Sequence, residues 1–181
     1  MPQEQQCPIC GRAVSAQARY PSYVCRNCLE EAPPVNRDGK RISYTNVDAS
    51  GGIQSQIEGS ADWLQGPDCE PICYVKGRRC RAEEARSGGV VIQVSYKLLG
   101  KDGPCESPTR GKLGGNGQAR IYGRLDCWSA VNAVKAGVTY QKHRVFFKDE
   151  ETAVASGYRP CGHCMRAEYK AWKAAKAVAG S

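Results

Sequence analysis

The eleven cysteines of this 181-residue chain offer its most distinctive chemistry, because six of them form Cys-x2-Cys pairs. Two intervening residues let a tight turn aim both sulfurs at one metal ion. The pairs Cys7/Cys10 and Cys25/Cys28 are separated by 14 residues, and together they predict a closed tetrahedral site of four thiolates. Such a site suits structural zinc and leaves no coordination position for catalysis. Iron fits the same spacing, whereas a redox role for either pair is the weaker hypothesis.

A third pair, Cys161/Cys164, needs two further ligands from upstream, and we predict that these are Cys127 and His143. One imidazole with three thiolates makes a closed zinc site. His163, which lies inside the pair, is the weaker candidate. The alternatives are a surface histidine at position 143 and a buried free thiol at position 127. With both sites filled, the chain is expected to bind two zinc ions.

The beginning of the chain favours metal binding over disulfides. Residues 1–6 lack the basic and apolar stretches of a secretory signal, so we expect a cytoplasmic protein whose thiols stay reduced. An odd number of cysteines would also leave one thiol outside a complete set of disulfides. No apolar run approaches the roughly 18 residues of a membrane-spanning helix, so no membrane partner is expected.

Apolar residues are too few for an ordinary hydrophobic core. Leu, Ile, Val and Phe together number 29 of 181, and a fraction below roughly 20% rarely buries enough surface to offset the conformational entropy of folding. A net charge of +8 is modest for a disordered chain of this length. We therefore expect metal cross-links to hold the fold, and we predict a fold class of small α+β zinc-binding modules.

Prolines and glycines suggest where the chain divides. Residues 7–31 resemble a zinc ribbon and are followed by Pro33-Pro34. Residues 100–117 contain six glycines and two prolines, a composition typical of a flexible linker. In chain order we predict zinc-ribbon knuckles, a β-rich region packed with the ribbon, the flexible linker and a C-terminal zinc domain: residues 1–34, 35–99, 100–117 and 118–181.

Short local patterns predict the secondary structure around these cysteines. Runs of β-branched and aromatic residues predict strands at residues 42–45, 72–75, 90–94, 119–122 and 144–147. Caps and glycine stops predict helices at 127–136 after Asp126, at 150–156 after Asp149, and at 165–178. Lys76-Gly77 is expected to turn a hairpin, and residues 82–86 are expected to form at most one or two helical turns.

The C-terminal third contains a more specific pattern. It consists of the run from Lys142 to Phe147, which contains a predicted strand, the segment from Asp149 to Ala155, which contains most of a short predicted helix, and the run Gly157-Tyr158-Arg159-Pro160-Cys161-Gly162-His163-Cys164. Over residues 118–172 this pattern resembles the zinc-binding domain of the Ada DNA-repair protein family. The resemblance implies an α/β zinc domain that binds DNA, in which a zinc-bound cysteine accepts a methyl group from a backbone methylphosphotriester.

The same resemblance exposes a departure at the acceptor position. The first two ligands of the family form a Cys-x3-Cys pair, and the first cysteine of that pair accepts the methyl group. If Cys127 matches the second cysteine, the acceptor position falls on Gly123, which has no thiol. We therefore expect a non-catalytic protein, and methyl-transfer repair remains an alternative only if Cys127 itself is the acceptor.

The excess positive charge is concentrated near the C-terminus. Residues 118–181 contain 11 basic and 5 acidic side chains, whereas residues 1–34 contain 3 of each. A localised basic face is typical of nucleic-acid binding, and a solvated lysine-rich surface is the alternative. We predict nucleic acid, DNA in particular, as the partner, with phosphate contacts from Arg144, Arg159, Arg166, Lys170 and Lys173. The other hypothesis is a zinc-stabilised adaptor that binds a protein partner through its N-terminal half.

Four cysteines lie outside both predicted sites: Cys69, Cys73, Cys80 and Cys105. They form a third metal site only if Cys105 folds back from the linker, and otherwise they are buried or free thiols. The sequence contains no paired carboxylates, Ser-His arrangement or phosphate-binding loop, so no catalytic residue is predicted.

Overall fold

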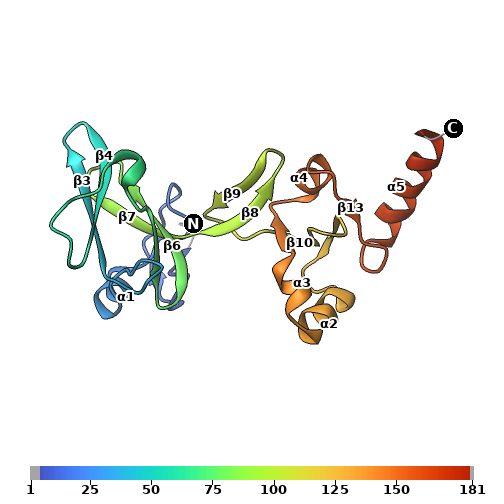
Figure 1. Cartoon of the computed structure of the whole chain (residues 1–181), viewed down its shortest axis with the longest axis horizontal. Helices are drawn as coiled ribbons and strands as arrows, with labels where there is room; N and C mark the ends of the chain where they lie inside the picture. Colours follow the sequence, from blue (N-terminus) through green and yellow to red (C-terminus); the bar gives the residue numbers. More distant parts are fainter. Residues whose placement is uncertain (1–4, 180–181) are drawn as a thin grey trace. The chain divides into compact units, whose positions relative to one another are not determined.

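A computed structural model of the protein describes residues 5–179. The chain divides into two compact units, unit 1 (Met1–Tyr96) and unit 2 (Lys97–Ser181), and each has its own sheets and its own core (Figure 1). The small α+β fold class predicted from the sequence is confirmed. Within residues 5–179, none of the helices combines the length and the apolar character needed to cross a membrane.

Unit 1 consists mainly of antiparallel strands. In chain order its elements are β1 (Gln5–Gln6), β2 (Ala13–Val14), α1 (Arg26–Glu31), β3 (Ile42–Asp48), β4 (Gly51–Ile57), the 3-10 helix η1 (Gly66–Asp68), β5 (Ile72–Val75), β6 (Arg78–Glu84) and β7 (Val90–Val94). β1 pairs with β2, β3 forms a long hairpin with β4, and β5, β6 and β7 form a three-stranded sheet (Figure 1).

The hairpin predicted at Lys76-Gly77 joins β5 to β6. Both loop residues have positive φ, 47° and 73°, as a two-residue loop of the favoured type requires. The helical turn predicted at residues 82–86 is wrong, because residues 78–84 form β6. This strand pairs with β5 on one side and β7 on the other, so its backbone groups are satisfied by the sheet and local helix propensity is overridden.

Three of the predicted metal ligands are part of the core of unit 1. Cys7, Cys25 and Cys28 lie in one buried cluster with strand residues such as Ile42 and Val75. Each of the three cysteines is at most 5% exposed. The cysteine knuckles and the strands of unit 1 therefore share a single core.

Unit 2 is a mixed α+β unit. Its elements, beginning at the boundary residue Tyr96, are β8 (Tyr96–Gly100), β9 (Gly103–Ser107), β10 (Leu113–Asn116), β11 (Ile121–Arg124), α2 (Trp128–Ala136), α3 (Val138–Lys142), β12 (Arg144–Phe147), α4 (Glu150–Ala155), β13 (Arg159–Pro160) and α5 (Arg166–Ala179). The four-stranded sheet has the order β12-β10-β11-β13, in which only the β11–β13 pair is parallel.

Residues 100–117, predicted to be a flexible linker, instead contain β9 and the central strand β10. The glycines of this segment allow close packing. A Cβ added at Gly115 would lie 2.8 Å from the carbonyl oxygen of Ile121 and 2.9 Å from the ring of Phe147. The glycine-rich composition therefore marks a close approach of backbone and side chains.

The helices of unit 2 begin mostly where their caps predict. Asp149 caps α4 and accepts a hydrogen bond from the backbone N–H of Thr152 (2.9 Å). The predicted cap Asp126 is one residue early, because Cys127 is the N-cap of α2 and makes no side-chain capping bond. The sequence predicts that Gly137 ends this helical segment, but one more short helix, α3, follows it.

The core of unit 2 is aromatic. Tyr122, Phe147 and Tyr158 are buried together with Ala153 and Met165. The rings of Phe147 and Tyr158 pack edge to face with centroids 4.8 Å apart, an arrangement that favours aromatic pairs. Among the described residues, no cysteine belongs to the buried set of this core, but half-buried Cys164 packs against it.

Candidate metal centres

The four-cysteine cluster consists of Cys7, Cys10, Cys25 and Cys28, whose Sγ atoms all lie within 4.8 Å of one another. A hydrogen bond from the N–H of Gly11 to the carbonyl of Cys7 (2.9 Å) closes the turn between the first two cysteines. Cys25 is the N-cap of α1, and Cys28 lies in the first turn of that helix. The structure thus brings together the four ligands that the two Cys-x2-Cys pairs predict.

The thiols of this cluster differ in how readily they ionise. Burial raises the pKa of the Cys7 thiol, but hydrogen bonds from three backbone N–H groups, chiefly that of Cys25, outweigh burial and lower it to about 6. Burial and the neighbouring thiols raise the pKa of Cys28 to about 12. Several negative sulfurs repel one another, and a divalent cation removes that repulsion. A closed set of four such donors fits zinc.

The three-cysteine cluster consists of Cys127, Cys161 and Cys164, whose Sγ atoms also lie within 4.8 Å of one another. Cys127 is buried at the start of α2, and the other two follow β13 and precede α5. The backbone N–H of Arg124 donates to Cys164 Sγ (3.3 Å), and that of His163 donates to Cys161 Sγ (3.4 Å). Hydrogen bonds of this kind favour thiolates, the form in which cysteine binds metal.

The thiols of the three-cysteine cluster also differ from one another in pKa. Burial raises the pKa of the Cys161 thiol, but hydrogen bonds from the backbone N–H groups of Cys164 and His163 outweigh it, so the net pKa lies below the ordinary value. Burial is the main cause that raises the pKa of Cys164 to about 12. A bound cation would let all three thiols ionise together.

His143, predicted as the fourth ligand of this site, is not brought to the three-cysteine cluster. It is the exposed C-cap residue of α3, and its carbonyl oxygen accepts a hydrogen bond from the N–H of Gly117 (2.7 Å). His143 directly follows α3, a helix that the sequence does not predict. His163, the weaker candidate, is also outside the cluster, and its exposed ring packs edge-on against Trp128 with centroids 5.1 Å apart.

Gly123 lies directly against the three-cysteine cluster. A Cβ added at this buried position in β11 would lie 2.8 Å from Cys164 Sγ and 3.0 Å from Cys161 Cβ. Any side chain at position 123 would therefore point at the thiols. The glycine leaves this side of the cluster without a donor atom.

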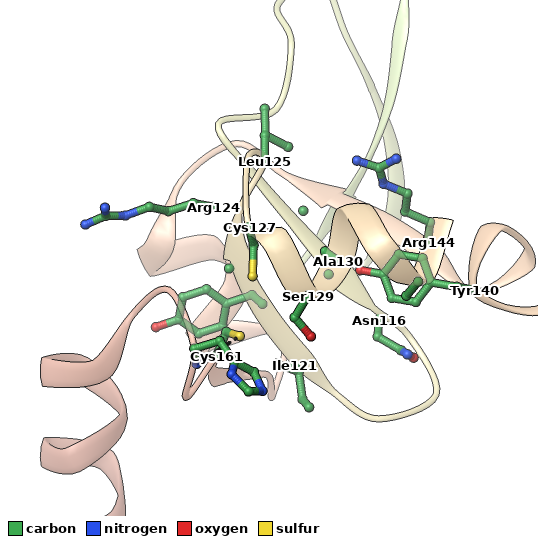
Figure 2. Close-up of a pocket in the computed structure, with 16 residues that line it drawn as sticks. Asn116, Ile121, Arg124, Leu125, Cys127, Ser129, Ala130, Tyr140, Arg144 and Cys161 are labelled. Carbon is green, nitrogen blue, oxygen red and sulfur yellow. Dashed lines mark hydrogen bonds between the residues drawn. The ribbon is translucent and has the colours of Figure 1, made fainter. Parts of the chain in front are cut away.

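A cavity of about 300 Å³ adjoins the three-cysteine cluster (Figure 2). Cys127 and Cys161 form part of its wall, and Figure 2 shows the hydroxyl of Tyr140 pointing toward the side where Cys127 lies. The guanidinium groups of Arg124 and Arg144 lie on opposite sides of the view. None of the described residues that line the cavity is acidic.

The cysteines of the middle region form no third metal cluster within the part of the chain that the structure describes. Cys73 and Cys80 are opposite each other on β5 and β6, and both are fully buried. Burial raises the pKa of Cys73 to about 11 and that of Cys80 to about 12. These thiols therefore serve as small core residues, while Cys69 lies in unit 1 and Cys105 is exposed in unit 2.

The basic residues predicted to contact phosphates fall into two groups. Arg144 and Arg159 are half-buried and pack on aromatic rings: the Arg144 guanidinium lies 4.9 Å from the ring centroid of Phe146, and that of Arg159 lies 5.3 Å from Tyr169. The other three are exposed on α5: Arg166, Lys170 and Lys173. The exposed group is the one that can reach a partner without loss of internal packing.

Sequence reasoning missed one exposed residue beside the three-cysteine cluster. Trp128 is 60% exposed at the first position of α2, and exposed Leu125 and Val131 lie near it in the sequence. The available signal was a tryptophan immediately after a predicted ligand, at the start of a helix. A large aromatic side chain left exposed here is a candidate contact for a partner.

Comparisons with known proteins add no relative: no protein-family model, no curated protein and no solved structure matches the chain. The fold and the two clusters define a small α+β protein with two cysteine-rich groups that can hold metal ions. The donor chemistry of both groups is compatible with zinc.

Proposed function

We propose that this protein binds two zinc ions and uses unit 2 to bind nucleic acid, DNA in particular, without catalysing a reaction. The main support for this proposal is the unequal distribution of charged residues between the two units. Unit 1 contains 11 basic and 11 acidic side chains, whereas unit 2 contains 15 and 7. The entire net charge of +8 thus belongs to unit 2, and a module with such an excess attracts a polyanion.

Helix α5 supplies the phosphate contacts in this proposal. Arg166, Lys170 and Lys173 are exposed and recur at steps of four and three residues, so they line one side of the helix. Glu168 is the only acidic residue among the 14 residues of α5, and it is half-buried. Exposed Trp128 adds a ring on which a base can stack.

We further propose that unit 1 contains a zinc ribbon and that unit 2 is an Ada-like zinc domain. Support for the second assignment comes from the succession of β12, α4 and the Cys161/Cys164 pair, and from Gly123, which stands against the thiols where the resemblance places the methyl acceptor. A glycine has no nucleophile to offer, and this supports a binding role over methyl-transfer repair.

Binding of the full zinc-loaded chain to duplex DNA, measured over a range of salt concentrations, tests the proposal. Affinity should fall steeply with salt because phosphate contacts release counterions. The variant Lys170→Gln/Lys173→Gln should lower the slope of log K against log salt by about 2, since each phosphate contact contributes roughly 0.9.

The control removes two equally exposed charges from unit 1, in the variant Arg37→Gln/Lys40→Gln. It should bind DNA as the unaltered chain does. Binding that is absent at low salt, or that the two variants weaken equally, would contradict the proposal. A stoichiometric protein partner that co-purifies without nucleic acid would favour the adaptor hypothesis instead.

A further inference from the structure

We infer that the metal ion of the three-cysteine cluster keeps one coordination position open toward the adjoining cavity, and that a small thiol binds there through its sulfur. The inference rests on metal binding by the cluster, one part of the proposed function, and is independent of nucleic-acid binding.

The open coordination position is inferred from the number of thiolate donors in the three-cysteine cluster. Zinc with cysteine ligands is almost always four-coordinate, and sites with three protein ligands complete the tetrahedron with an external ligand. The four-cysteine cluster is complete by itself, but among residues 5–179 the other group contains only Cys127, Cys161 and Cys164. Neither histidine of the chain belongs to it.

The surroundings provide room for an external ligand. Cys127, Cys161 and Gly123 line the cavity of about 300 Å³. The room lies in this cavity, because the side of Gly123 that faces the thiols is already filled: a Cβ there would lie 2.8 Å from Cys164 Sγ. A volume of this size holds a ligand of several heavy atoms. Its wall is mixed, with small apolar residues such as Ala130 and with the hydroxyl-bearing Ser129.

The chemistry of the site favours a sulfur donor. Three thiolates make a soft metal environment that suits a further soft ligand better than a carboxylate or phosphate oxygen. On binding, the thiol would lose its proton to the buffer, and its sulfur would bond to the ion in place of a water molecule. The added negative charge is tolerated because unit 2 has a net charge of +8 and no acidic residue among those described lines the cavity.

Cadmium-113 NMR of the full chain tests the inference, because each bound ion gives its own resonance and the four-cysteine cluster serves as an internal control. Before any ligand is added, the two resonances should differ, one in the range of four sulfurs and one in the range of three. Mercaptoacetate should move only the second, into the four-sulfur range. Glycolate, which has an oxygen in place of the sulfur, should move neither.

Three variants make the test specific to the cavity and to the cluster. Ala130→Leu, at a position that lines the cavity and is not a ligand, narrows the cavity and should weaken mercaptoacetate binding about tenfold or more. Ala136→Leu, an exposed position on the same helix that does not line the cavity, should bind as the unaltered chain does. Gly123→Cys should give a four-sulfur resonance without added thiol, with adjustment of the nearby thiols.

The outcomes separate this inference from the proposed function. Failure of unit 2 to take up cadmium would overturn both the inference and the second zinc site. Uptake followed by no response to mercaptoacetate, by an equal response to glycolate, or by removal of the ion would overturn the inference alone. DNA binding at low salt can persist in each of these latter cases.

Discussion

The two cysteine clusters share their ligand chemistry but differ in what surrounds them. In unit 1, Cys7, Cys25 and Cys28 are members of the hydrophobic core itself. In unit 2 the core is built from aromatic side chains, and Cys127 is the one fully buried cysteine of the three-cysteine cluster. A metal ion in unit 1 would therefore replace missing apolar packing, whereas one in unit 2 would lie beside an aromatic core, against which only Cys164 of the three ligands packs.

The two units also differ in net charge and in how open their cysteine clusters are to other molecules. Unit 1 is electrically neutral and has four donors in a closed set, whereas unit 2 has the whole net charge, a three-donor set and an adjacent cavity. A closed site in a neutral unit stabilises a fold, whereas an incomplete site within a basic unit can interact with other molecules. Cysteine spacing alone does not distinguish these two uses.

The largest effect should come from breaking the four-cysteine cluster. Cys28→Ser removes a ligand that is 2% exposed in the core, and structural zinc contributes roughly 10–16 kcal/mol to the folding of small zinc modules. Unit 1 should unfold while one zinc per chain stays bound. Zinc content together with hydrogen exchange of unit 1 amides measures both consequences.

Cys105→Ser is the matched control, because Cys105 is exposed and lies outside both clusters. This variant should keep two zinc ions and full amide protection. If Cys28→Ser also keeps two ions and the same protection, the four-cysteine cluster does not hold unit 1 together.

A smaller but still large effect is expected from the aromatic core of unit 2. Phe147 is fully buried against Tyr158, so Phe147→Ala should lower the free energy of unfolding by about 3–5 kcal/mol. Phe146→Ala, at the half-buried neighbouring position, should cost clearly less. Thermal or denaturant unfolding of the zinc-loaded chain gives both values, and equal losses would count against the proposed core.

Loss of a ligand in unit 2 should cost less than loss of its core. Cys161 is half-buried and outside the aromatic core, so Cys161→Ser should release zinc from unit 2 but destabilise the unit by only about 1–3 kcal/mol, the usual range for one substitution. Zinc content and unfolding are measured on the same sample. Complete unfolding of unit 2 would erase the contrast between the two clusters.

The smallest effect concerns the cap of α4. Hydrogen bonds from the side chain and backbone N–H of Thr152 lower the pKa of Asp149 below its ordinary value of 3.8. A carboxylate whose folded pKa is depressed stabilises the fold at pH values above the ordinary pKa, and this contribution is lost as the pH falls through the lower folded pKa. Asp149→Ala should therefore lower the melting temperature at pH 7, while Asp149→Asn, which can still cap, should lower it less. Equal melting temperatures for all three proteins would show that the cap is unimportant.

Cysteine spacing predicted most of the candidate sites because ligand geometry is local. The turn within each Cys-x2-Cys pair depends on a few residues, and seven of the eight predicted ligands lie in the two clusters. His143 lies outside both clusters, and it directly follows α3, a five-residue helix after Gly137 that the sequence does not predict. Such a short helix is set by its neighbours rather than by propensity.

The remaining differences arise from tertiary packing. Residues 82–86 have helix-forming side chains, but strands on both sides of β6 determine their conformation. Glycines in residues 100–117 resemble a linker in composition, yet Gly115 is needed where a Cβ would meet Ile121 and Phe147. Local sequence predicts neither the pairing of β6 nor the close approach at Gly115. In both cases the contacting residues come from another strand.

X-ray absorption at the zinc edge of the fully loaded chain tests the central claim most directly, because it gives the average number of sulfur atoms bound per zinc ion. Seven thiolates shared between two ions predict two zinc ions per chain and an average of 3.5 sulfur ligands per zinc. An average of four sulfurs with two zinc ions bound, or only one zinc ion per chain, would contradict a four-thiolate site in unit 1 paired with a three-thiolate site in unit 2.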